Sequence, residues 1–173
     1  MYMNTDEAIK RTLHDIEDME KVNAALPIIK KVVEAWDGKV LNKRFGDALQ
    51  AAGLPGRIYL DNHYDTTWEV HYHPEDSNDW YTVLHGAKPT CKYYSPENSF
   101  VTPDKRISAS QAFTIIEAGR VERLQKITAY KEHLRTWEAK KAQIDMLKKQ
   151  LKTITDSIPY TLQDYFNMRL RTY

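Results

Sequence analysis

Residues 108–157 read SASQAFTIIEAGRVERLQKITAYKEHLRTWEAKKAQIDMLKKQLKTITDS, and this stretch decides the fold. It has no proline and a single glycine, Gly119. At ~1.5 Å of rise per residue, some 50 helical residues reach roughly 75 Å, far beyond an average three-turn helix. We therefore predict a long C-terminal helix, which another helix of the chain, a second copy or a partner must cover.

Apolar residues recur along this stretch with the spacing of a coiled coil. One set is spaced by seven, and a second set fills much of the other seam: Tyr130, Trp137, Ile144, Leu151 and Ile158, then Leu134, Leu147 and Ile154. The pair Lys140–Lys141 interrupts the pattern. Two alternatives stay open: a homodimer through the long helix, or intermittent packing against a shorter helix of the same chain.

Charge points to the N-terminal helix as the companion. Segment 4–26 carries three bases and six acids, 3 − 6 = −3, whereas segment 120–152 carries ten bases and four acids, 10 − 4 = +6. Exposed ion pairs give only ~0.2–1 kcal/mol each, so they orient two helices while apolar stripes stabilise the pair. We expect the acidic helix to lie antiparallel on the basic one, as a coiled-coil-like hairpin.

Helical periodicity upstream predicts three N-terminal helices, over 4–26, 27–37 and 39–52. Asn4 and Glu7 have the spacing of a capping box. Pro27 is tolerated in a first helical turn, so the second helix is expected to start there. Gly53 and Pro55 end the third.

The period then changes to two, which predicts strands at 57–63, 66–73 and 79–85. Short polar links between them favour an antiparallel sheet. Residues 86–107 form a connection that could hold a fourth strand near 92–94, and 159–173 a short terminal helix. The expected class is α+β, with a head over 1–107, a helical arm over 108–158 and a tail.

The bulk composition suits a folded protein without a membrane segment. The formal net charge is +1, and Cys91 is the single cysteine, so no internal disulfide can form. The N-terminus is polar and acidic, and no apolar run reaches membrane-spanning length. We expect a cytoplasmic protein.

Alternation along the strands gathers histidines and carboxylates on one face of the sheet, opposite Trp68, Val70 and Tyr72. The face holds Asp61, His63, Glu69, His71 and His73. Such groups suit zinc or a similar divalent ion, or general acid–base chemistry. A solvated or partner-binding face is the simpler interpretation, because a lone His-x-His pair lacks a third ligand at diagnostic spacing.

The sheet region is also rich in aromatic residues, more than three strands can bury. Exposed tyrosine and tryptophan favour a protein-binding surface, since they combine contact area with a polar tip. The residues expected to bind a partner are Tyr59, Trp80, Tyr81, Tyr93 and Tyr94.

The long helix carries a run of bases that could grip phosphates or simply face solvent. They are Arg120, Arg123, Lys126, Lys131, Arg135, Lys140, Lys141, Lys148, Lys149 and Lys152. The sequence shows no recognisable nucleic-acid-binding module beside them.

The chain has no phosphate-cradling glycine loop and no Gly-x-Ser-x-Gly or His-Glu-x-x-His motif. We therefore expect a non-catalytic protein-binding protein without a cofactor, an adaptor or an inhibitor. Its most specific version is a phage or mobile-element inhibitor of a host defence nuclease complex. Two alternatives stay open: a nucleic-acid binder that uses the basic helix, and a metal-dependent hydrolase that uses the histidine face.

Overall fold

The computed structural model describes residues 5–61, 67–87 and 98–157. Its elements are α1 (Thr5–Ala35), α2 (Lys43–Ala51), β1 (Arg57–Asp61), β2 (Thr67–His73), β3 (Tyr81–Ala87) and α3 (Ala109–Ser157). The chain divides into two compact units, residues 1–130 and 131–173. The first 22 residues of α3 thus belong to the N-terminal unit, and the division falls later than the predicted boundary at 107/108.

Helix α1 joins the two helices predicted over 4–26 and 27–37 into one of 31 residues, with Pro27 inside it. A proline in a helix interior removes one backbone hydrogen bond and costs about 3 kcal/mol. Buried side chains on both sides of it, Val22 and Leu26 before and Ile29 and Val33 after, hold the helix on the core and offset that cost. The prediction of a break at Pro27 was wrong for this reason.

Helix α2 begins later than predicted, at Lys43, after the N-cap Asn42, whose side chain accepts a hydrogen bond from the Arg44 amide. Before it, residues 36–38 form a turn and Val40 forms an isolated antiparallel bridge with Arg106. The Leu41 amide donates to the Lys105 carbonyl, and the Ile107 amide donates to the Lys39 carbonyl. These hydrogen bonds to a distant segment keep residues 39–41 out of the helix that the local sequence pattern predicts.

The sheet is antiparallel, with strand order β1-β2-β3, as predicted. Tyr59 pairs with His71 across β1 and β2, and Val70 pairs with Leu84 across β2 and β3. A bulge follows, since His71 pairs with Thr82 and Val83 is the extra residue. Gly56 leads into β1 with φ of +92°, and a Cβ there would lie 2.2 Å from the His73 carbonyl oxygen, so the turn requires glycine.

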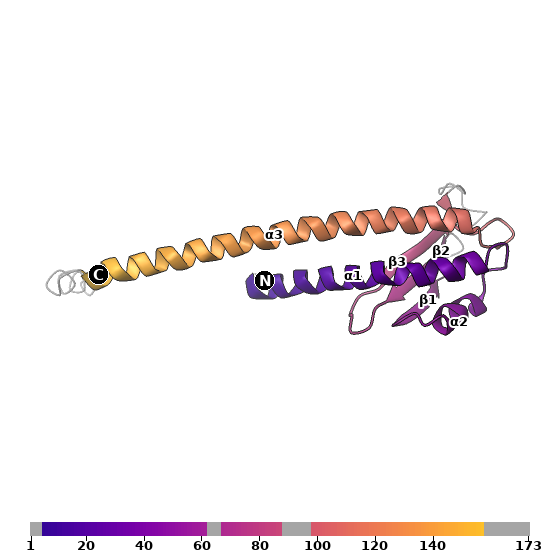
Figure 1. Cartoon of the computed structure of the whole chain (residues 1–173), viewed down its shortest axis with the longest axis horizontal. Coiled ribbons are helices and arrows are strands. Elements are labelled where there is room, and N and C mark those ends of the chain that lie inside the picture. Colours follow the sequence, from indigo (N-terminus) through magenta and orange to yellow (C-terminus); the bar gives the residue numbers. More distant parts are fainter. Residues whose placement is uncertain (1–4, 62–66, 88–97, 158–173) are drawn as a thin grey trace, which may run out of the picture. The chain divides into compact units, whose positions relative to one another are not determined.

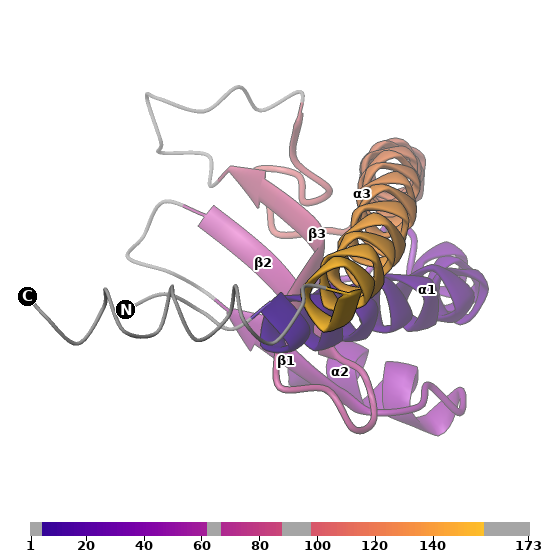
Figure 2. The ribbon, with the colours of Figure 1, turned by 90° about the vertical axis from the view of Figure 1, so that its left-hand side faces the viewer.

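The core lies between the inner face of the sheet and the helices; Figure 2 shows α1 on one side of the sheet and α2 beside β1. Its fully buried large side chains come from every described element except β1, and from the segment before α3: Val22, Leu26, Ile29, Val33, Phe45, Leu49, Val70, Tyr72, Leu84, Phe100, Ile107 and Ile116. Phe100 and Ile107 fall in the segment predicted as a plain connection, which therefore supplies core.

Helices α1 and α3 form the predicted antiparallel hairpin within the N-terminal unit, side by side in Figure 1. Lys30 Nζ lies 3.0 Å from Glu117 Oε2, and Arg123 Nε donates to Asn23 Oδ1 at 2.8 Å. The start of α3 is fixed by Asp37, whose Oδ1 accepts from the Ala109 amide. The possible fourth strand near 92–94 and the tail helix over 159–173 lie outside the described residues.

A buried polar cluster fixes the loop between β2 and β3 to α1. Asp18 is fully buried, and its Oδ2 accepts a hydrogen bond from Ser77 Oγ at 2.5 Å. His14 Nε2 and the Tyr81 hydroxyl each lie 3.5 Å from the same oxygen. All three partners face Oδ2, whereas Oδ1 is buried without a hydrogen-bond partner among the described residues, so the carboxylate is only partly compensated for the loss of water.

Candidate functional site

Strand alternation places the predicted residues on the outer face of the sheet. Val70 and Tyr72 are fully buried beneath it, whereas Glu69, His71 and His73 are only partly covered. Tyr59 and Asp61 of β1 lie opposite His71 and Glu69. The two faces expected from the sequence are therefore the two faces observed.

Four rings meet on this outer face. The Tyr59 ring stacks beside the His71 ring at 6.3 Å between centroids and meets the Trp80 ring edge-on at 6.2 Å. Trp80 also lies 4.8 Å from the His73 ring. Tyr59 remains 54% exposed and Trp80 48%. Ring contacts on a pleated surface hold these side chains in place while leaving half of each open to a partner. We call Tyr59, His71, His73 and Trp80 the aromatic patch.

Polar groups surround His71 on both sides. Its Nε2 lies 3.1 Å from Glu69 Oε2 and 4.0 Å from Asp61 Oδ2. Its Nδ1 lies 3.1 Å from Thr82 Oγ1. The order hydroxyl, imidazole, carboxylate is the arrangement in which a histidine can accept a proton from a hydroxyl. Acyl transfer also needs oxyanion donors and a closed site, and this face is an open sheet surface.

The predicted metal set is only partly assembled. Asp61, Glu69 and His71 come together, but His73 lies against Trp80 instead, and His63 is outside the described residues. Within residues 5–61, 67–87 and 98–157, no group of three histidine, cysteine, aspartate or glutamate side chains has a geometry that could hold a metal ion. Zinc binding stays an untested prediction.

Three of the five aromatic residues predicted to bind a partner can be placed. Tyr59 and Trp80 belong to the aromatic patch. Tyr81 is partly buried, packs on the core and points its hydroxyl at Asp18; burial and that carboxylate raise the pKa of Tyr81 above its usual range. Tyr81 is therefore a structural residue, because the β3 register turns it inward opposite Tyr72. Tyr93 and Tyr94 lie outside the described residues.

A groove of about 510 Å³ adjoins the aromatic patch, between α2 and the edge strand β1. Gly46 and Gln50 line it from α2, and Leu60 and Trp68 line it from the sheet. Tyr59, Asp61 and Glu69 border both the groove and the outer face. This groove is not evident from the sequence, because it forms where α2 meets β1, a contact that no local pattern encodes. Gly46 was its one available signal, a glycine on the face of an otherwise regular helix.

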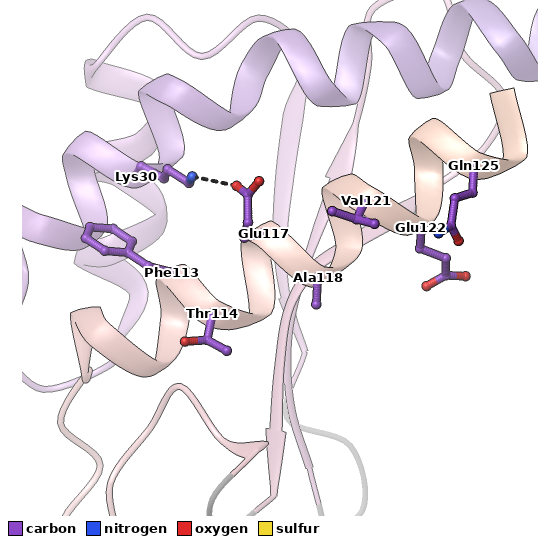
Figure 3. A pocket seen from close by; sticks show the side chains of 8 residues that line it. All are labelled: Lys30, Phe113, Thr114, Glu117, Ala118, Val121, Glu122 and Gln125. Carbon is purple, nitrogen blue, oxygen red and sulfur yellow. Dashed lines mark hydrogen bonds and ion pairs between the residues drawn. The ribbon is translucent and has the colours of Figure 1, made fainter. Parts of the chain in front are cut away.

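A second hollow, of about 810 Å³, is shallow and follows the outward face of α3 within the N-terminal unit (Figure 3). Phe113, Ala118 and Val121 line it, together with the Lys30–Glu117 ion pair. Hydrogen bonds from Arg120 and Lys30 lower the pKa of Glu117 to about 2. The surface is mostly apolar.

The predicted basic face is not continuous. Arg123 is buried between the helices, where it contacts Asn23, and burial lowers its pKa. It was wrongly placed on the solvent face, because position 123 falls on the same stripe as Ile116. Arg120 pairs with Glu117 and Lys126 with Glu122. The remaining bases lie on residues 131–157, which are considered below.

Comparison with known proteins gives no further guide: no family model, no curated protein and no solved structure matches this chain. Within the described residues, no helix is long and apolar enough to cross a membrane. The site must therefore be interpreted from its own residues.

Proposed function

We propose that this chain is a non-catalytic protein-binding protein, and that its binding surface is the aromatic patch together with the adjoining groove. The observation that carries the proposal is the pair Tyr59 and Trp80, each about half exposed on a sheet whose opposite face is the core of the unit. Tyrosine and tryptophan dominate the binding energy of protein interfaces. A rigid platform limits the entropy lost when they are covered.

The groove extends this surface toward the sheet edge. β1 is the edge strand of the described sheet, so an extended segment of a partner can lie along it while a side chain enters the groove. Asp61 and Glu69 at the border would favour a partner that presents basic or hydrogen-bond-donating groups there.

The test is capture of a partner from a lysate of the source cells or their host, with wild-type protein and two variants. The first variant combines Tyr59→Ala and Trp80→Ala. The control is Trp137→Ala, which removes an exposed tryptophan from the other unit. We expect one protein, recovered in stoichiometric amount by wild type and control and lost with the double variant. Recovery by all three, or of nucleic acid in place of protein, would contradict the proposal.

The inhibitor version makes a narrower claim. If the captured protein belongs to a nuclease complex, adding wild-type chain should reduce its cleavage rate, and adding the double variant should not. A captured protein whose activity is unaffected would favour an adaptor.

One observation favours a hydrolase of another kind than the metal-dependent one expected from the sequence: Thr82, His71 and Glu69 lie in line, as in general acid–base catalysis. His71→Ala would abolish any ester or amide hydrolysis that depends on this line. Far-ultraviolet circular dichroism would confirm that the variant folds. If the wild type has no such activity, or if His71→Ala leaves the activity unchanged, His71 is only part of the binding surface.

A further inference from the structure

Within the described residues 131–157, the second half of α3 exposes an apolar seam. Its five members are at least 41% exposed, and Leu151 reaches 65%. They are Trp137, Ile144 and Leu151, spaced by seven, with Leu147 and Ile154 each three residues after a member of the first set. This is the two-position repeat of a coiled coil. We call these five residues the distal seam.

The distal seam continues a stripe that the N-terminal unit already uses. Steps of seven from Ile116 reach Arg123 and Tyr130 and then Trp137. Ile116 and Arg123 are buried where α3 packs on α1. Helix α1 has 31 residues and α3 has 49, so at least 49 − 31 = 18 residues of α3 have no counterpart in α1. Along the first half the covering element is α1, and the second half repeats the apolar seam positions that α1 covers there.

Charge decides which kind of helix fits the distal seam. The charged side chains within and beside it are all lysines: Lys140 lies in the seam, and Lys141 and Lys148 border it. The acids Glu138 and Asp145 lie one position further out, three or four residues from Lys141 and Lys148, and Asp156 lies on the opposite side of the helix. A helix that lies on the seam therefore meets the lysines first.

A second copy fits this surface poorly. Residues 131–157 carry seven bases and four acids, 7 − 4 = +3, so two copies repel. In a parallel pair, Lys140 faces Lys140 of the other copy inside the seam. In an antiparallel pair with Ile144 opposite Leu147, Lys141 of each copy lies beside Lys148 of the other. Both arrangements bring like charges together.

We propose that the distal seam binds an amphipathic helix of a partner protein that carries acidic residues along the borders of its apolar face. Such a helix buries the five apolar side chains and places carboxylates against Lys140, Lys141 and Lys148. This surface is separate from the aromatic patch, and the proposal does not depend on the function of that patch.

The test uses the full chain and two synthetic 28-residue peptides that share leucine at both seam positions. The acidic probe has glutamate at both bordering positions, and the basic probe has lysine there. Fluorescence anisotropy of the labelled peptides gives their affinities. Two bordering lysines and the one lysine within the seam predict that the acidic probe binds about tenfold tighter or more, and that the difference shrinks as salt is raised.

Two variants locate the binding. Ile144→Asn with Leu151→Asn should abolish binding of the acidic probe. The triple charge reversal K140E, K141E and K148E should invert the preference toward the basic probe. The matched control reverses Lys149 and Lys152, which lie off the seam, and should keep the preference of the wild type.

Several results would overturn the proposal. One is equal affinity for the two probes, and another is binding that survives the two asparagine substitutions. A third is a dimer in sedimentation of the free chain that Ile144→Asn with Leu151→Asn dissociates. Circular dichroism of each variant confirms that the helix persists. Partner capture through Tyr59 and Trp80 is scored separately, so either proposal can fail without the other.

Discussion

The two halves of α3 are built from the same heptad stripe and have opposite surroundings. In residues 109–130 the stripe includes Ile116 and Arg123, both buried against the rest of the N-terminal unit. In residues 131–157 the stripe includes Ile144 and Leu151, both more than half exposed. Local sequence specifies a helix in both halves, but tertiary contacts decide what each half contributes. The first half supplies stability, and the second supplies an exposed surface.

The largest expected effect comes from matched truncations on the two halves. Ile116→Ala removes fully buried methyl groups and should lower the free energy of unfolding by ~2–5 kcal/mol. Leu151→Ala acts on a mostly exposed side chain and should change it by no more than ~0.5 kcal/mol. Urea denaturation followed by circular dichroism measures both. Similar losses in the two variants would mean that the second half is also part of a packed core.

A smaller contrast is expected for the two arginines Arg123 and Arg135. Arg123→Ala leaves the Asn23 side chain without its partner and should destabilise the protein by ~1–3 kcal/mol. Arg135 is exposed and makes only a 3.7 Å contact with Glu132, so Arg135→Ala should be nearly neutral. Thermal unfolding of the pair provides the comparison. Equal melting temperatures would contradict a buried role for Arg123.

The smallest effect is a pH dependence specific to the first half. Arg120 and Lys30 lower the pKa of Glu117 to about 2 from its usual value near 4.5, so its ion pairs stabilise the fold above that usual value. This contribution is lost as pH falls from about 4.5 to 2. The melting temperature of wild type should exceed that of Glu117→Gln at pH 6, and the gap should close near pH 2.

The control for this pH effect is Glu132→Gln, which alters an exposed carboxylate in the second half. Its gap from wild type should stay small over the same range. A gap for Glu117→Gln that is unchanged at low pH would show that the Lys30–Glu117 contact does not form in solution.

Elements with a strong local period could be predicted from the sequence. The alternation of Trp68, Val70 and Tyr72 with Glu69, His71 and His73 fixed both faces of β2, because a strand's side chains alternate by geometry alone. The absence of proline between 108 and 157 likewise predicted α3 almost to the residue.

Features that depend on distant contacts could not be predicted. Pro27 favoured a break, but core packing on both sides overrode it. The bulge after Val70 turns Tyr81 inward, and no turn residue in the sequence predicted this bulge. The groove between α2 and β1 and the burial of Arg123 both arise where segments far apart in sequence meet.

The most direct test of the two-part account of α3 is hydrogen exchange along this helix, in dilute protein with and without the acidic probe peptide. The account predicts slow exchange of the amides in 112–127 under both conditions. It predicts fast exchange across 137–154 in the free chain and marked protection there when the peptide is bound. Equal protection of both halves in the free chain, or no change on adding peptide, would contradict it.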